Sequence, residues 1–138
     1  MGAAGYAGEE AGGNGSVRED ELSLRSAAIA TLYPRHARIH RIVFGRGLDL
    51  HQSAHALGLS VPQARRRIAR VREEYREGLA ALILAAGSGR RCGVLAEIVS
   101  DLGGEPSPEL REAVVAHARS CGTCQARVHP ALARSCGL

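Results

Sequence analysis

The chain has no tryptophan, no lysine and a single phenylalanine among its 138 residues. Aromatic side chains are scarce and no run alternates convincingly between apolar and polar residues, which argues against a β-sheet protein. Alanine and leucine dominate instead, and both favour helix. The longest apolar run, "GLAALILAAG", is far below the roughly 20 residues needed to cross a bilayer. We therefore predict an all-α protein with no membrane partner.

A secretory signal is also missing, because the N-terminus is acidic and glycine-rich and not basic followed by apolar. This favours a cytoplasmic location, where clustered cysteines are more often metal ligands or reactive thiols than disulfides. The sequence shows no paired carboxylates, no nucleophile–base arrangement and no phosphate-binding loop. We expect neither enzyme activity nor a small-molecule substrate.

Acidic residues are sparse in the middle of the chain. Residues 33–76 carry ten arginines against three acidic residues, a net charge of +7, whereas residues 1–32 carry −3 and residues 77–138 are balanced. A basic block of this density predicts a polyanionic partner, most simply nucleic acid. We divide the chain into a disordered glycine-rich tail (1–20), a helical DNA-binding domain (21–86), a linker (87–91), a zinc-binding domain (92–128) and a weakly patterned tail (129–138).

Two helices in the basic block have clear start and stop signals. Asp49 and Gln52 form a capping box before the first helix and Gly58 ends it, and Ser60 and Gln63 repeat the box before the second. The second helix continues through "ARRRIARVREEYREGLAALILAA", with apolar residues three and four apart. A short helix, a tight turn with glycine and a long Arg-rich helix together predict a helix-turn-helix.

The first turns of the second helix are the part that enters the major groove in this motif. Arginine pairs with guanine, glutamine pairs with adenine, and alanine leaves room for a thymine methyl. The flanking arginines suit phosphates. The alternative is a solvated basic helix that binds nothing specific. The candidate base readers are Gln63, Arg65, Arg66 and Ala69, and the candidate phosphate contacts are Arg67, Arg70 and Arg72.

A second chemical feature is the stretch "HARSCGTC", which contains His117, Cys121 and Cys124. His117 and Cys121 face one side of a helix because they are four residues apart, and Cys124 returns from the following turn. Cys92 is the best fourth residue, since antiparallel packing of its helix against the next brings it to the same end. Three thiolates and one imidazole suit a tetrahedral structural zinc site.

A redox role or simple burial would account for these cysteines less well than a metal does. A thioredoxin-type redox motif requires a βαβ setting, and no strand is predicted. Cysteines that merely pack as small hydrophobes leave the spacing of His117 unexplained. A redox-labile zinc site is a variant of the zinc hypothesis, and Cys136 has no assigned role.

Two histidine pairs without a thiol or carboxylate cluster beside them are expected at the surface or near DNA: His36 and His40, and His51 and His55.

The segment "LYPRHARIHRIVFGRGLDLHQSAHALGLSVPQARRRIARVREEYREGL" resembles region 4 of bacterial sigma factors of the extracytoplasmic-function type. That family shows a Pro-Arg-led helix, an aromatic-Gly break, an A-x-x-L-G-hydrophobic-S turn and a recognition helix ending in R-x-R. The resemblance covers about residues 21–84 and implies that Gln63, Arg65, Arg66 and Ala69 read an upstream promoter element, while Arg67, Arg70 and Arg72 face the DNA backbone. Ser53 stands where the family usually buries Ile, and Ala64 where it often has Val. No region 2 precedes this block, so we do not expect a complete sigma factor.

Residues 92–128 resemble the zinc-binding anti-sigma domain, which places an upstream ligand before an H-x3-C-x2-C motif. The resemblance implies Zn²⁺ held by Cys92, His117, Cys121 and Cys124. That family has a further helix that wraps around the sigma factor, and the sequence predicts none after Cys124.

Two functions remain open. One is a protein that binds duplex promoter DNA, whose zinc module is a folding staple, a brake on the DNA face, or a dock for RNA polymerase or another sigma factor. The second is an anti-sigma-like module that binds a sigma factor and not DNA.

Overall fold

The structure, a computed structural model, describes residues 21–87 and 91–135. Over these ranges the chain forms seven helices and no strand, so the all-α prediction is confirmed. None of the helices in the described ranges has the length and apolar character needed to span a membrane. The predicted tail at residues 1–20, residues 88–90 of the predicted linker, and Cys136 lie outside the described residues.

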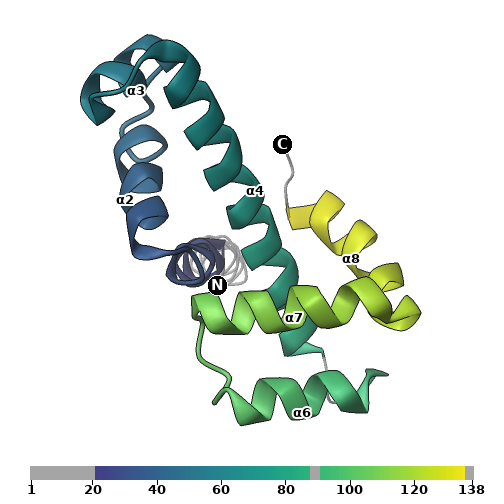
Figure 1. The fold of residues 1–138 in the computed structure, drawn as a ribbon. Helices are drawn as coiled ribbons and strands as arrows, with labels where there is room; N and C mark the ends of the chain where they lie inside the picture. The colour runs from purple at the N-terminus through teal and green to yellow at the C-terminus, as the bar shows by residue number, and fades with distance from the viewer. Residues whose placement is uncertain (1–20, 88–90, 136–138) are drawn as a thin grey trace, which may run out of the picture.

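One long helix organises the fold. A first helix over residues 21–30 is followed by α2 (Pro34–Val43), α3 (Leu50–Leu57), α4 (Val61–Ala86), α6 (Gly93–Asp101), α7 (Pro108–Ser120) and α8 (Gly122–Ser135). Helices α2 and α3 pack along the first half of α4, and α6, α7 and α8 gather around its second half (Figure 1). The two predicted chemical features thus lie toward opposite ends of α4.

The capping signals in the sequence set the starts of the helix pair. The Asp49 carboxylate accepts the Gln52 N–H at 2.8 Å, and the Gln52 side chain accepts the Asp49 N–H at 3.0 Å. Ser60 and Gln63 form the same reciprocal pair before α4, at 3.3 and 3.0 Å. Gly58 ends α3 at φ 66°, in the left-handed region that glycine adopts without strain. Both predicted capping boxes are confirmed.

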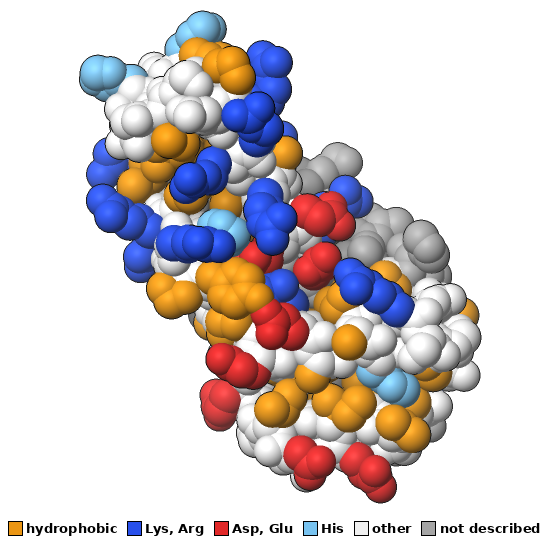
Figure 2. All heavy atoms as spheres, viewed as in Figure 1, with side chains coloured by type: hydrophobic (Ala, Val, Ile, Leu, Met, Phe, Trp, Pro, Cys, Tyr) orange, Lys and Arg blue, Asp and Glu red, His pale blue; other side chains and the backbone are white. Residues whose placement is uncertain are grey.

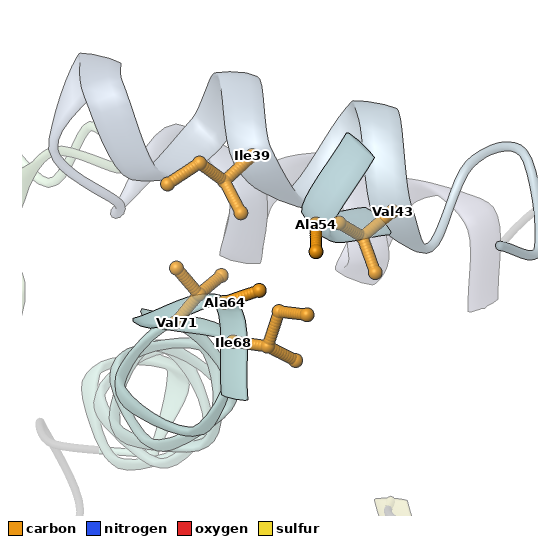
Figure 3. Close-up of a cluster of buried hydrophobic side chains, with 6 residues drawn as sticks. All are labelled: Ile39, Val43, Ala54, Ala64, Ile68 and Val71. Atoms are coloured by element: carbon orange, nitrogen blue, oxygen red, sulfur yellow. The ribbon is translucent and has the colours of Figure 1, made fainter. Parts of the chain in front are cut away.

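A first hydrophobic core joins α2, α3 and the start of α4. Its side chains face one another across the three helices in Figure 3, and none is more than 8% exposed. The spacing along α4 is the predicted pattern of apolar residues three and four apart. The members are Ile39, Val43, Ala54, Ala64, Ile68 and Val71.

A second core lies around the other half of α4. It combines residues of α4, α6, α7 and α8, all of them at most 1% exposed. The sequence predicted no helix after Cys124, and α8 corrects this, because Cys124 and Val128, four residues apart, pack into this core. The apolar pattern of α8 is short, and the helix is held by tertiary packing. The buried members are Ala81, Leu84, Leu95, Leu110, Val114 and Cys124.

Between the two cores α4 departs from the expected pattern. Tyr75 is the apolar residue four positions after Val71, but Glu74 is the buried one, at 6% exposure, and Tyr75 is half-buried with its ring 4.8 Å from the ring of His40. One turn later Gly78 lies against the first helix. A Cβ at Gly78 would collide with Oγ1 of Thr31, so the absence of a side chain allows the two segments to approach closely.

Candidate metal centre and nucleic-acid interface

The four residues predicted to hold a metal come together at the edge of the second core. Their ligand atoms all lie within 4.8 Å of one another. Cys92 is the N-cap of α6, His117 lies in the last turn of α7, Cys121 is the C-cap of α7, and Cys124 lies in the first turn of α8. Three helix ends therefore meet at one point.

Local sequence signals explain this convergence. Ser107 starts α7 by accepting the Leu110 N–H at 3.1 Å, and Pro108 occupies the first helical position. This fixed start places Leu110, Val114 and His117 on the same face of α7, toward the second core. The chain then turns at Cys121 and α8 begins at once with Gly122.

The donor set and its spacing fit a tetrahedral zinc ion. The Cys92 sulfur lies 3.4 Å from Nε2 of His117. Zinc–sulfur bonds of about 2.3 Å and zinc–nitrogen bonds of about 2.0–2.1 Å place such neighbours roughly 3.6 Å apart in a tetrahedron. Soft thiolates with an imidazole are ligands that select zinc over hard cations such as magnesium. The cluster is close enough to hold a metal ion such as zinc.

The thiols in this cluster have different acidities. A hydrogen bond from the backbone N–H of Cys124 lowers the pKa of the Cys121 thiol to about 7, with further lowering by the Cys124 thiol, His117 and Cys92. Burial raises the pKa of the Cys124 thiol to about 12, and the neighbouring sulfurs add to that rise. Because crowded thiolates repel one another, a bound divalent cation is what would allow all three to ionise together.

The arrangement of the cysteines argues against simple burial and against a thioredoxin-type redox pair. Cys92, Cys121 and Cys124 are free thiols in the structure. Cys124 is fully buried, as a cysteine acting as a small hydrophobe would be, but Cys92, His117 and Cys121 are only half-buried and still converge on it. A thioredoxin-type setting is absent from the described residues, because they contain no strand.

The predicted reading residues lie on the exposed side of α4. Its buried positions in the first half, Ala64, Ile68 and Val71, face α2 and α3 together with the half-buried Val61, and the seven predicted residues are exposed. This is the arrangement that a recognition helix needs, since one face must hold the helix in place while the opposite face meets DNA. The exposed residues are Gln63, Arg65, Arg66, Arg67, Ala69, Arg70 and Arg72.

Gln63 and Arg72 are already engaged within the protein. The Gln63 carbonyl oxygen accepts the Ser60 N–H in the capping box, so its amide NH₂ is the group left to contact a base. The Arg72 guanidinium lies 5.2 Å from the centre of the Phe44 ring, a cation–π contact that orients it. Leu59 lies beside Gln63, Arg66, Arg67 and Arg70 at a shallow depression.

The basic surface extends beyond the seven residues predicted from the sequence. Arg35, Arg38 and Arg41 of α2 and Arg46 after it are exposed as well. Figure 2 shows most of the blue side chains over α2 and the start of α4, and most of the red ones toward α6 and α7. The concentration of charge at residues 33–76 in the sequence was the signal for these additional arginines.

The histidine predictions are correct for one pair and wrong in part for the second. His51 and His55 are exposed as expected. His36 is buried, at 3% exposure. Its Nδ1 lies 3.0 Å from a carboxylate oxygen of Glu74, which is on α4 between the two cores. His40 is half-buried against Tyr75, and this burial lowers its pKa.

Arg111 completes the buried group around Glu74. It is 4% exposed and lies 3.6 Å from the Glu74 carboxylate. Sequence reasoning missed this network. Glu74 lies three residues after Val71 and so faces the same side of α4, but no local signal in the sequence marks Arg111 as its partner.

No protein-family model, no curated protein and no solved structure matches this chain. A function therefore rests on the two sites themselves.

Proposed function

We propose that this chain is a DNA-binding transcription protein that resembles sigma region 4 and recognises a promoter element through α3 and α4. The observation that supports this most is the two-sided first half of α4. Apolar residues hold its inner side against α2 and α3, and arginines fill its outer side. A capped helix whose first turns project from the protein in this way suits the major groove.

Each outward residue has a proposed role. Arg65 and Arg66 would pair with guanine through two hydrogen bonds each, Gln63 would contact adenine through its free NH₂, and Ala69 would leave space for a thymine methyl. The phosphates would be bound by a flanking set of arginines whose positive charge attracts DNA of any sequence. That set is Arg67, Arg70 and Arg72.

The proposed role of the thiol cluster is structural. Cys92, His117, Cys121 and Cys124 would supply all four ligands to Zn²⁺, which leaves no open position for a substrate. The ion would tie together the ends of α6, α7 and α8, each of which is too short to be stable alone. We propose no catalytic role for the site.

DNA binding can be tested with the full chain and a randomised duplex library. Selected and unselected duplexes would be compared by fluorescence anisotropy between about 50 and 200 mM NaCl, where phosphate contacts weaken steeply. Three phosphate arginines predict a slope of log affinity against log salt of about −3. A chain that binds neither kind of duplex at low salt would refute the proposal.

Two variants separate base reading from phosphate binding. Arg66→Ala should relax the preference at one base pair, at a cost of about 1–3 kcal/mol for the preferred sequence. Arg67→Ala should weaken all sequences equally and reduce the salt slope by about 1. Arg119→Ala is the matched control, because Arg119 is exposed on α7 away from α4's reading face.

Two observations favour the anti-sigma-like alternative, in which the chain binds a sigma factor. A helix does follow Cys124, and the Gln63 carbonyl is occupied by the cap. However, α8 packs on α4 and α7 and is not free to wrap around a partner. The alternative would be favoured if the chain bound no DNA even at low salt but captured a purified sigma factor in a pull-down. A pull-down with purified RNA polymerase would test whether the zinc module contacts the polymerase.

A further inference from the structure

The two cores are joined by a buried group of charged and polar atoms with Arg111 at its centre. Arg111 belongs to α7, the helix that also carries His117 and ends at Cys121. Its Nε donates to the carbonyl oxygen of Thr31 at 2.9 Å, and one terminal nitrogen donates to Glu77 of α4 at 3.2 Å. The second terminal nitrogen lies 3.6 Å from Glu74.

Glu74 passes this connection on to α2. One of its carboxylate oxygens accepts the backbone N–H of Tyr33 at 3.2 Å, and both lie within 3.1 Å of Nδ1 of His36. Tyr33 is the N-cap of α2, and its own side chain makes no capping bond. The carboxylate of Glu74 therefore does at the start of α2 what a capping side chain normally does.

The guanidinium also contacts Tyr33 directly, since its central carbon lies 4.9 Å from the centre of the Tyr33 ring. A single residue of α7 thus touches the loop before α2, the N-cap of α2 and two carboxylates of α4. These partners are largely shielded from water, because Arg111, Glu74, His36 and Thr31 are at most 6% exposed.

A buried network of this kind is sensitive to the loss of one member. Removing the guanidinium would leave the Glu74 carboxylate buried without its cation, which is far more costly than losing an exposed pair. A displacement of α7 would have the same effect as removal. The far end of α7 carries His117 and Cys121, two of the four residues that would hold the metal, so a bound metal would fix the position of that end.

We infer that Arg111 is a positioning residue that transmits metal occupancy to the DNA-binding half: with the metal bound, α7 holds Arg111 against Glu74, and Glu74 holds the start of α2. Without the metal, α7 loosens, α2 loses its cap, and the helix-turn-helix loses its fixed geometry. This inference rests on the proposed function. It makes metal binding and DNA binding linked equilibria. The metal must then raise the affinity for DNA by the same factor by which DNA raises the affinity for the metal.

The first experiment measures that factor. The affinity of the full chain for a labelled mixed-sequence duplex would be determined with Zn²⁺ and after zinc removal, and the zinc affinity with and without DNA by competition with a chromophoric chelator. We expect Zn²⁺ to raise the affinity for DNA at least about fivefold, and DNA to raise the affinity for Zn²⁺ by the same factor. A wild-type chain that binds DNA equally with and without Zn²⁺ would overturn the inference.

Substitutions then test the role of Arg111. In Arg111→Met zinc should still bind, because all four ligands remain, but the factor should fall to about one. Arg111→Lys keeps a cation and should restore part of the coupling. Glu112→Gln, on the next and exposed residue of α7, is the control and should behave like wild type. Full coupling in Arg111→Met would overturn the inference.

Hydrogen exchange gives a measurement that does not depend on DNA. Zinc removal should speed exchange of the amides of α2 as well as those of α7, and Arg111→Met should speed exchange in α2 even with zinc bound. If neither zinc removal nor Arg111→Met changed the rate of amide exchange in α2, the inference would be overturned. If the chain binds no DNA but α2 still responds to zinc through Arg111, only the proposed function fails and the coupling between the two halves stands.

Discussion

The same substitution, serine to alanine, should have opposite effects at two positions of this chain. Ser53 of α3 is fully buried beside the first core, and its hydroxyl oxygen has no hydrogen-bond partner among the described residues. Ser107 is the N-cap of α7, and its hydroxyl accepts the Leu110 N–H at 3.1 Å. We expect Ser53→Ala to raise the free energy of unfolding and Ser107→Ala to lower it.

The magnitudes follow from the two environments. A buried polar group without a partner costs about 1–3 kcal/mol, and Ser53→Ala removes that cost. The small cavity left by the missing oxygen destabilises the protein by only a few tenths of a kcal/mol, at about 24 cal/mol per Å³ of cavity. The net gain at Ser53 is therefore about 1 kcal/mol. Loss of a serine N-cap costs typically about 1 kcal/mol, so the two variants should differ by about 2 kcal/mol.

Urea denaturation followed by circular dichroism would measure this difference in zinc-loaded protein. A change of about 1 kcal/mol corresponds to a shift in melting temperature of about 4 °C in a protein of this size. The m-values should stay equal, because neither change alters the surface exposed on unfolding. If Ser53→Ala were as destabilising as Ser107→Ala, the Ser53 hydroxyl would have to be hydrogen-bonded, and the packing described for α3 would be incorrect.

Further perturbations probe the junction and the metal site. Gly78→Ala should destabilise by about 1–3 kcal/mol because its methyl group meets Thr31, whereas Gly93→Ala, with open space at its Cβ, should not; thermal unfolding would compare them. In metal-free protein, iodoacetamide should modify Cys121 well before Cys124, with half-maximal rate near pH 7, as read by peptide mass spectrometry. Equal rates would contradict the assigned pKa values. Zinc affinity should fall as pH is lowered, because protons compete for the ligands, and chelation should reduce the helix signal; a chain indifferent to chelators would count against the site.

Local signals in the sequence were sufficient for much of the fold. The starts of α3, α4 and α7 follow from Asp49, Ser60 and Ser107, because a capping side chain acts within four residues of itself. Helix α8 could not be obtained in this way. It depends on Cys124 and Val128 packing into a core made by three neighbouring helices, and such contacts have no local signature.

The candidate metal cluster was predictable for a related reason. His117, Cys121 and Cys124 are close in sequence, so the end of α7 and the turn after it bring three of the four donors together, although Cys121 lies in extended backbone after α7 and not on the helix as predicted. Only Cys92 is distant in sequence, and its position depends on how α6 packs against α7. The group around Glu74 was not predictable, because Arg111 is distant in sequence, and nothing in its neighbours distinguishes it from the exposed arginines elsewhere.

The continuity of α4 gives the two halves of the molecule a fixed angular relation. Ala69 on the exposed, arginine-bearing side and Ala81 in the second core belong to one uninterrupted helix, in which each residue advances about 100°. Insertion of one residue between them would rotate the proposed reading side against the candidate metal cluster by that angle. An insertion between Glu74 and Glu77 would also move Glu74 away from Arg111. The relation between the two sites is therefore set twice, once by the backbone of α4 and once by the buried charges that cross it.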